Sequence, residues 1–489
     1  IENMFSHTAK AEHGEAAISF TFPGLKAGSV IEYRYKKAQN YYSNIASWRF
    51  QLSIPCAYSL CKVIVPNIVE LSYRPVVTRA ISIDSVADNK KIKKDNSQTN
   101  FLMTDVPSFI SEPLMTSTFD NLQRIEFSLL PKAYFLSGST ADVKWLRYNI
   151  MLLASPYFGE QINTTVKGTD SLVNAAREMI TTKEKIQLIT NMVKQRIEWN
   201  EEQTFEADDI QLCWDKKKGS SAEMNLLLLN LLRSAGVSAM PILVSTRGNG
   251  RPDKNFVSLG QFNGVDVLAM DSNDVYILDA TQKNLSYKIT PLNVIYTDAF
   301  IVDESHSKWI AISDPRQLMN NSVFVRCMMD AGGNVKGEAD IYYKDYAKAE
   351  KLEDEEKKEN TGSKRESKDM INENTPDLVV DSLEKHFDKE PDLPLLHKLY
   401  FHFETESTEN IYFLNPFFFS MFRKNPFADN TRRTDIDFGC SQVYMTNVNI
   451  LLDDIMILEE MPASTTIRMA DTSIVFIRAT SRNGQSITI

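Results

Sequence analysis

The stretch KKKGSSAEMNLLLLNLLRSAG, Lys216–Gly236, is the most informative segment for the structure of the central part of this chain. A charged, glycine-containing approach leads into a strongly apolar segment, and this pattern predicts a buried helix. Ser220 fits the N-cap position and Glu223 lies three residues later, which is the spacing of a capping box. Gly236 supplies a stop signal at the other end. A serine at such a helix start is far more often a cap than a nucleophile, so the helix alone does not predict catalysis.

The segments around this helix predict a compact α+β unit. Before it, between Thr169 and Ile197, apolar residues recur at helical spacing. After it, the stretches PILVSTR (241–247), VDVLAM (265–270) and VYILDAT (275–281) indicate strands.

The first and last thirds of the chain alternate between apolar and polar residues, which is typical of half-buried antiparallel strands. Examples are SLCKVIVP (59–66) and SIVFIRAT (473–480). We therefore expect a multidomain α+β protein with an N-terminal β-sandwich over residues 1–165, an α+β core over 166–300 and a C-terminal β-sandwich over 301–489. A charged insertion near 345–372 predicts a surface helix with a frayed end.

Composition narrows the classes of function. The chain has 489 residues, a net charge of −10 and a pI near 5.3, which argue against nucleic-acid binding because that function needs a basic face. No apolar run is long enough to cross a bilayer. The strongest candidate, FLNPFFFSMF (413–422), is short and is broken by Asn415 and Pro416, so we expect buried aromatic packing there.

No cofactor and no metal site is expected. The six histidines form no ligand-spaced pair with a carboxylate, and His397 and His402 lie five residues apart on a strand-like segment where they can face opposite sides. The run DSND (271–274) has calcium-like residue types but fits a hairpin turn better.

Five cysteines are scattered along the chain without a CxxC pair, so neither a zinc knuckle nor a redox pair is suggested. Cys56 and Cys61 are close enough in sequence to form a disulfide, although nothing in the spacing requires one. Cys213 lies in the approach to the central helix beside Trp214, which indicates packing rather than a nucleophile.

The central stretches GSSAEMNLLLLNLLRSAGVSAMPILVSTR, SLGQFNGVDVLAM and VYILDAT together resemble the transglutaminase-like, papain-like core. KIQLITNMVKQRIEWN (185–200) resembles the helix that precedes that core. FPGLKAGSVIEYRYKKAQNYYSNIASWRFQLSIPCAYSLCKVIVP (22–66) resembles the domain of unknown function DUF3857, and NPFFFSMFRKNPFADNTRRTDIDFG (415–439) resembles DUF3858, which follows the core in the same proteins. The resemblance covers nearly the whole chain and implies a Bacteroidetes-type protein of the periplasm or the outer-membrane surface.

The resemblance also points to three positions of a Cys-His-Asp triad. Such cores carry a cysteine at the helix start and a histidine in the F-N-H stretch, whereas this chain has Ser221 and Gly264 at those places. The acidic position is kept as Asp279. A serine hydroxyl needs a general base, glycine supplies none, and no histidine occurs between His13 and His306. We expect His306 to be an ordinary surface residue and Asp279 to tie down the loop that follows it.

We therefore expect a pseudoenzyme without catalytic residues: a binding or scaffold protein of the bacterial cell envelope, either on its own or as one subunit of an envelope complex. Its partner would be an envelope protein, a peptide or a glycan. The alternative is a transglutaminase-like or cysteine-peptidase-like enzyme with an unusual Ser nucleophile and a base delivered from elsewhere in the fold. The chain starts at Ile1 without a signal peptide, so the expected location rests on the resemblance alone.

Overall fold

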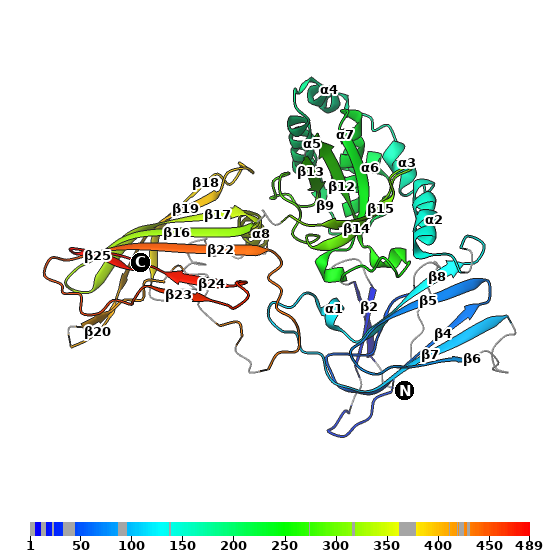
Figure 1. Cartoon of the computed structure of the whole chain (residues 1–489), viewed down its shortest axis with the longest axis horizontal. Coiled ribbons are helices and arrows are strands. Elements are labelled where there is room, and N and C mark those ends of the chain that lie inside the picture. The colour runs from blue at the N-terminus through cyan, green and yellow to red at the C-terminus, as the bar shows by residue number, and fades with distance from the viewer. Residues whose placement is uncertain are drawn as a thin grey trace.

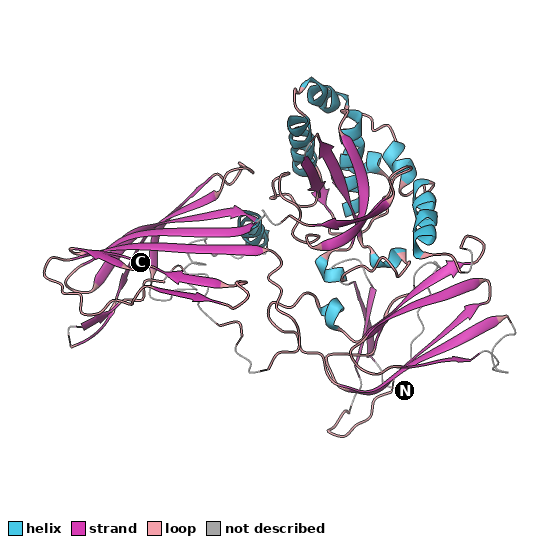
Figure 2. Cartoon of the chain, in the orientation of Figure 1, coloured by secondary structure: helices cyan, strands magenta, loops and turns pink. Residues whose placement is uncertain are grey.

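A computed structural model gives the fold of the chain. It describes residues 5–10, 16–21, 24–32, 45–86, 95–135, 138–272, 274–314, 318–360, 378–409, 411–417, 419, 425–427 and 431–489. The described residues form three lobes, each with its own hydrophobic core (Figure 1). Strands occur in all three lobes and most of the helices lie in the middle one (Figure 2), so the mixed α+β character predicted from the sequence is confirmed.

The N-terminal lobe consists of two antiparallel three-stranded sheets that share one core. The alternation of strand residues sends Val63, Phe101 and Phe127 into this core, where Phe50 and Ile125 are fully buried. One sheet has the order β3-β8-β5, with β3 at Trp48–Arg49, β8 at Arg124–Pro131 and β5 at Val69–Val76; the other has the order β4-β7-β6, with β4 at Cys56–Pro66, β7 at Asn96–Val106 and β6 at Ser82–Val86. A separate ribbon pairs β1 (Phe5–Lys10) with β2 (Ala16–Thr21), and a short helix α1 covers Thr118–Asn121.

The middle lobe packs helices against one antiparallel five-stranded sheet. The order is β13-β12-β11-β14-β15, with β11 at Ser238–Val244, β12 at Gly264–Asp271, β13 at Asp274–Leu278, β14 at Thr297–Ile301 and β15 at Lys308–Ile312. The helices are α2 (Ala141–Leu153), α3 (Gly159–Asn163), α4 (Asp170–Glu178), α5 (Thr182–Arg196), α6 (Ile210–Lys216) and α7 (Ser221–Ser234). The hairpin expected at DSND is present, because Asp271 pairs with Asp274.

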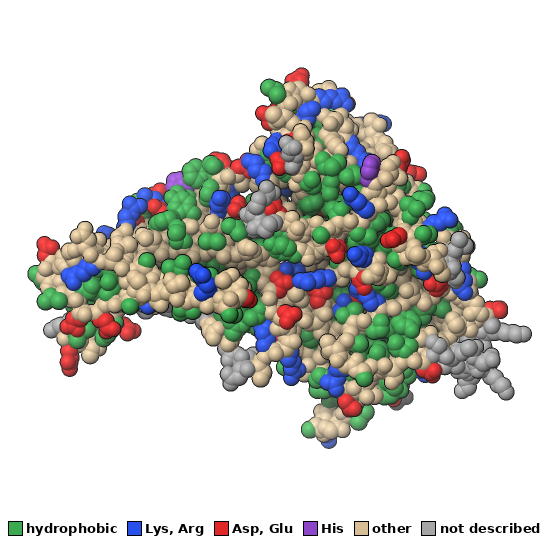
Figure 3. All heavy atoms as spheres, viewed as in Figure 1, with side chains coloured by type: hydrophobic (Ala, Val, Ile, Leu, Met, Phe, Trp, Pro, Cys, Tyr) green, Lys and Arg blue, Asp and Glu red, His purple; other side chains and the backbone are tan. Residues whose placement is uncertain are grey.

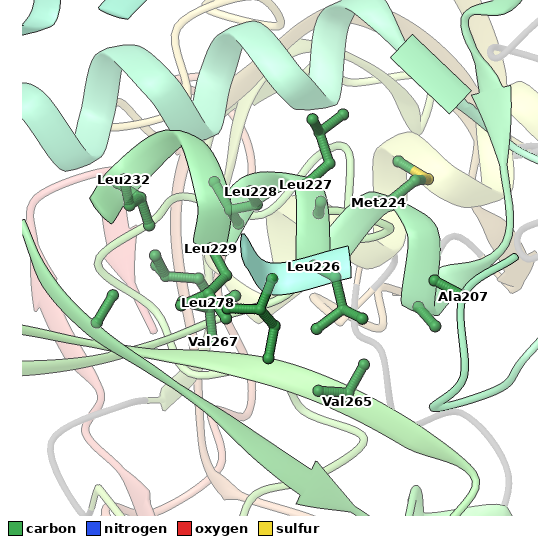
Figure 4. Close-up of a cluster of buried hydrophobic side chains, with 14 of the residues drawn as sticks. Ala207, Met224, Leu226, Leu227, Leu228, Leu229, Leu232, Val265, Val267 and Leu278 are labelled. Atoms are coloured by element: carbon green, nitrogen blue, oxygen red, sulfur yellow. The ribbon is translucent and has the colours of Figure 1, made fainter. Parts of the chain in front are cut away.

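Helix α7 is the central helix predicted from the opening stretch. Leu226 and Leu229 point toward Val265, Val267 and Leu278 of β12 and β13, while Leu227 points to the opposite side of the helix (Figure 4). Most of its 14 residues are buried, which is why the apolar positions of the sequence cover nearly the whole helix circumference. The predicted stop is also present, since Gly236 follows the helix with φ +81°, a conformation that favours glycine.

The hydrophobic core of the middle lobe extends beyond the segment 166–300 that the sequence assigned to it. Trp145 and Tyr148 of α2, together with Phe158, are buried in the same core as α7. At the other end, β14 and β15 continue the sheet to Ile312. The buried apolar residues of α2 thus belong to the core of the middle lobe and not to that of the N-terminal lobe.

The C-terminal lobe is built on one seven-stranded sheet with the order β18-β19-β17-β16-β22-β26-β25. We expected two facing sheets; in the described residues, one face of this sheet instead buries its side chains beneath helix α8 (Tyr346–Asn360). The strands are β16 (Leu318–Met329), β17 (Asn334–Asp345), β18 (Val379–His386), β19 (Leu395–Glu404), β22 (Ser441–Leu452), β25 (Ser481–Asn483) and β26 (Ser486–Thr488). Two ribbons pair β20 (Glu406–Thr408) with β21 (Ile411–Phe413) and β23 (Thr465–Arg468) with β24 (Val475–Arg478).

The charged insertion begins as the helix that its composition predicted. Tyr346 and Ala347 of α8 are buried in the core of the C-terminal lobe, so this helix is docked on one side rather than fully solvated. The remainder of the expected insertion, including its frayed end, lies outside the described residues.

A segment that we call the strap (residues 431–440) ties the C-terminal lobe to the other two. The carboxylate of Glu112 accepts hydrogen bonds from the backbone amides of Arg433 and Thr434, at 2.9 and 2.8 Å. Asp437 forms an ion pair with Arg247 at 2.7 Å and a weaker one with Arg251 at 3.2 Å. Figure 3 shows basic and acidic side chains side by side where the lobes meet.

None of the helices in the described part of the chain is both long and apolar enough to cross a bilayer.

Candidate functional site

The start of α7 carries the capping box predicted from the sequence. The Ser220 hydroxyl accepts a hydrogen bond from the Glu223 backbone amide at 3.3 Å, and the Glu223 carboxylate accepts one from the Ser220 amide at 2.8 Å. These reciprocal bonds satisfy two of the amide groups that a helix start leaves open. Ser220 is therefore a cap.

Ser221 is the first residue of α7, and its side chain is enclosed. Only 1% of the residue is exposed. Its hydroxyl donates to the Thr204 carbonyl at 2.9 Å and accepts from the Thr204 amide at 2.9 Å, while its own amide donates to the Glu202 carbonyl at 2.9 Å. The stretch 202–204 is part of the loop between β9 (Glu198–Trp199) and α6, and it runs along the start of α7. We call this stretch the crossing segment. Both hydrogen-bonding directions of the Ser221 hydroxyl are used by backbone groups.

Gly264 begins β12 and lies opposite Val244 of β11. A β-carbon at residue 264 would lie 2.6 Å from Gln203 Nε2 and 3.2 Å from Val244 Cγ2. The position to which the sequence resemblance assigned a histidine is therefore covered by the Gln203 side chain from the crossing segment. Sequence reasoning missed Gln203, because nothing in a polar loop marks which side chain will fold over a strand.

Asp279 directly follows β13 and is only 5% exposed. Its Oδ1 atom accepts hydrogen bonds from the Thr281 amide at 2.9 Å and from Asn225 Nδ2 at 3.0 Å. The Thr281 hydroxyl lies 2.8 and 2.9 Å from its two carboxylate oxygens. The predicted role of Asp279 in holding the following loop is confirmed by these bonds.

Asn225 joins the elements that carry Ser221, Gly264 and Asp279, the three positions to which the sequence resemblance pointed. It lies one turn after Ser221 on α7, and besides Asp279 its side chain bonds the Val265 carbonyl at 2.9 Å and the Ala280 amide at 2.7 Å. Ser221, Gly264 and Asp279 are thereby brought to one end of α7. Asn225 was also missed from the sequence, although an amide inside an otherwise apolar helix run was a usable signal.

A buried polar cluster lies beside Asp279. Asp266, two residues after Gly264, is 3% exposed, and its Oδ2 atom has no hydrogen-bond partner among the described residues. Burial, and then the charge of Asp279, raise the pKa of Asp266 well above its usual range. Lys194 of α5 donates to the Leu285 carbonyl at 2.8 Å, and burial lowers its pKa to about 8 although Asp279 opposes this shift.

The other candidate nucleophiles and bases lie elsewhere. The side chain of His306 is 73% exposed and contacts Asp303, as expected of a surface residue. Cys213 is buried, and its pKa is raised to about 12 by burial and then by Glu223 and Asp209, which leaves it a protonated thiol at neutral pH.

All five cysteines are free thiols. Cys56 and Cys61 lie five residues apart on the same extended strand β4, too far apart for a disulfide. His397 is buried and the His402 side chain is 51% exposed, so the two face opposite sides of β19 as expected. In the described part of the chain, no group of three or more His, Cys, Asp and Glu side chains is placed to hold a metal ion.

Comparison with known proteins supports the fold at two levels. Residues 6–109 match the family model of DUF3857, a domain of unknown function with a solved structure. The whole chain shares its fold with a "putative protease" from Parabacteroides distasonis ATCC 8503: the TM-score is 0.54 at 11% sequence identity, over 92% of this chain and 69% of that one. At this level of identity the similarity shows a shared fold.

A second similar structure is a "putative cysteine protease" from Cytophaga hutchinsonii, with 14% identity over 54% of this chain and 83% of that one. Its TM-score is 0.22, which carries no argument about the fold. No curated protein matches the chain.

Proposed function

We propose that this chain is a non-catalytic binding or scaffold protein of the bacterial cell envelope, built on a transglutaminase-like core whose triad is degenerate. The observation that carries the proposal is the crossing segment. It engages the Ser221 hydroxyl from both sides and lays Gln203 over Gly264. The space that a substrate and a histidine would need is therefore taken by the chain itself.

The chemistry of the three positions supports the same proposal. A serine nucleophile needs a base within hydrogen-bond reach, and the hydrogen bonds of the Ser221 hydroxyl among the described residues go to backbone groups of Thr204. Asp279 would orient a histidine in an active core, but here its carboxylate oxygens accept hydrogen bonds from Thr281 and Asn225. The acid of the triad has become a structural group.

The competing function is an enzyme of the transglutaminase or cysteine-peptidase class that uses Ser221 as its nucleophile. One observation favours it: Ser221 is the first residue of a 14-residue helix, where the helix dipole stabilises developing negative charge. It requires a rearrangement in which the crossing segment leaves and a base approaches.

The test compares the wild-type chain with the Ser221→Ala variant. Peptidase activity, release of ammonia from glutamine peptides and incorporation of a fluorescent amine are measured for both, with an active cysteine transglutaminase as the positive control. We expect both chains to stay at the background rate. Turnover in the wild type that disappears in Ser221→Ala would overturn the proposal and establish the enzyme.

The envelope location is a separate part of the proposal, and it is supported by the resemblance and by the bacterial source of the structure that shares the fold. Fractionation of native cells, with protease treatment of intact and permeabilised cells, tests it. Recovery of the protein in the cytoplasmic fraction would contradict this location and would leave the proposal that the triad is degenerate unaffected.

A further inference from the structure

A large cleft lies on the side of the C-terminal lobe that faces Leu114 and Arg251 of the other two lobes. Ser221, Gly264 and Asp279 do not line it. Its volume is about 1890 Å³. It extends from the end of β19 and the β20–β21 ribbon, along the first half of β22 and the β24 strand, to the strap and to the loops at Leu114 and Arg251. Small-molecule sites occupy roughly 300–1,000 Å³. The size of this cleft and the number of elements that line it suit a chain molecule better than a small ligand.

Apolar side chains line this cleft and remain accessible. Phe413 is 65% exposed, Phe476 46% and Phe427 38%. We expected the aromatic run that begins at Phe413 to be buried; Phe419 is buried in the lobe core, but Phe413 is not. Exposed aromatic side chains gathered in a concave surface mark a binding site rather than ordinary surface.

Among the described residues that line this cleft, negative charge is in excess. Glu404, Glu406 and Asp435 are exposed, and none of their carboxylates forms an ion pair with a described residue. The one cation among the described lining residues, Arg251, is already paired with Asp437. A ligand that brings positive charge therefore complements the cleft.

One acid and one aromatic side chain form a defined unit. Glu406 of β20 lies directly opposite Phe413 of β21 in the ribbon, so their side chains stand next to each other on one face. A lysine or arginine side chain placed here pairs with the carboxylate and at the same time packs its stem and its charge on the ring. The chain already uses such a contact nearby, where the Arg432 guanidinium lies 5.8 Å from the centre of the Phe427 ring.

The edge of β22 favours an extended peptide. This strand runs from Ser441 to Leu452, whereas β26 is registered only with Asn449–Leu451 and Ile489 bonds Val448. Gln442 and Thr446 come earlier on this strand and line the cleft. Alternate residues direct their backbone groups to the same edge, so Thr446 presents its N–H and C=O on the side where Val448 bonds Ile489. An extended main chain matches such groups by strand addition.

We propose that this cleft binds an extended peptide segment in which basic and apolar side chains alternate. The apolar side chains pack on the accessible phenylalanines, the basic ones meet Glu404, Glu406 and Asp435, and the peptide main chain continues the sheet along β22. This inference deepens the proposed binding function and rests on it for the role of the chain, but it uses none of the triad positions.

The experiment measures fluorescence anisotropy with three labelled octapeptides at moderate salt: alternating Lys and Phe, alternating Glu and Phe, and alternating Lys and Ser. The full chain is compared with Phe413→Ser and Glu406→Lys. Tyr134→Ser and Glu460→Lys are the matched controls, since both residues are exposed and lie outside the cleft. Thermal melting verifies that each variant is folded.

We expect the Lys-Phe peptide to bind most tightly, and each cleft variant to raise its Kd about tenfold while the controls leave it unchanged. Equal binding of the Lys-Ser peptide, or equal Kd values in all variants, would overturn the proposal. So would binding of a chito-oligosaccharide at the cleft with no peptide bound there. The outcome is independent of the turnover assay. Failure of the peptides to bind would not affect the proposal that the triad is inactive, and detection of turnover would not affect the proposal that the cleft binds a peptide.

Discussion

The side-chain amide nitrogen of Gln203 lies 2.6 Å from the point that a β-carbon of residue 264 would occupy. The Gln203 side chain therefore occupies the volume that a side chain at position 264 would need. The absence of a side chain at 264 and the course of the crossing segment over this position belong to one packing arrangement. The relationship makes the two positions energetically dependent on each other.

The first prediction concerns this dependence. Gly264→Ala adds a methyl group that must displace the end of the Gln203 side chain, so the substitution should be about 1 kcal/mol more favourable in a Gln203→Ala background. Urea unfolding of the two single variants and the double variant measures the coupling. Gly248, around which a β-carbon meets nothing within 4 Å, gives the control: Gly248→Ala should show no coupling with Gln203. Additive effects at 203 and 264 would contradict the shared volume.

The second prediction separates the two serines at the helix start. Ser221→Ala removes a buried hydroxyl and leaves both backbone groups of Thr204 without that partner, which should lower the free energy of unfolding by about 1–3 kcal/mol. Ser220→Ala removes the cap and should cost about 1 kcal/mol. Chemical unfolding of both variants tests this. If Ser221→Ala is as stable as the wild type, the hydroxyl does not hold the crossing segment.

The third prediction concerns pH. The pKa of Asp266 is raised in the folded state by burial and by Asp279, so the folded chain keeps a proton that the unfolded chain releases. The stability contributed by this proton is fully present below the unfolded pKa, about 3.9, and is lost as pH rises through the folded pKa. Asp266→Asn cannot ionise and should remove this loss. We expect it to be more stable than the wild type at pH 8, by a margin that shrinks toward pH 4.

Urea unfolding across this pH range measures the margin. Asp298→Asn is the control, because Asp298 is an exposed strand residue of the same sheet. A constant difference between Asp266→Asn and the wild type at every pH would show that Asp266 does not hold an extra proton in the folded state.

The fourth prediction concerns the strap. The Thr434 hydroxyl and the backbone amides of Arg433 and Thr434 lower the pKa of Glu112 although burial opposes the shift, so the contact is present above the unfolded pKa and is lost as pH falls through the folded one. Glu112→Ala should speed hydrogen exchange at these two amides about tenfold or more. Glu460→Ala serves as the control. Unchanged exchange in Glu112→Ala would mean that other contacts hold the strap.

Local patterns predicted the central helix well. The capping box of Ser220 and Glu223, the leucine run and the stop at Gly236 all follow from interactions within a few residues, and each is confirmed. The alternation of strand residues likewise revealed the β-rich flanks. It did not reveal how the C-terminal strands assemble, because alternation fixes which side of a strand is buried and not whether a helix or a second sheet covers it.

The candidate site was only partly predictable. The resemblance drew attention to Ser221, Gly264 and Asp279, and the structure brings these positions to one end of α7. Gln203 could not be anticipated, since its role depends on a loop that returns over a strand distant in sequence. The burial of Asp266 could not be predicted for a related reason. A carboxylate in a predicted strand is normally assigned to the solvent-facing side, whereas both faces of β12 are buried.

The pairing of β16 has a consequence for how the chain is made. β16 lies in the middle of its sheet, between β17, which follows it directly in sequence, and β22, which runs parallel to it. Leu318 of β16 therefore cannot pair with its partner Ser441 until β22 has been synthesised. During synthesis the central strand of the lobe leaves the ribosome long before its second neighbour, and its open edge is exposed for that time. Ribosome-bound chains that stop before Ser441 should therefore depend on chaperones far more than chains that extend past Leu452.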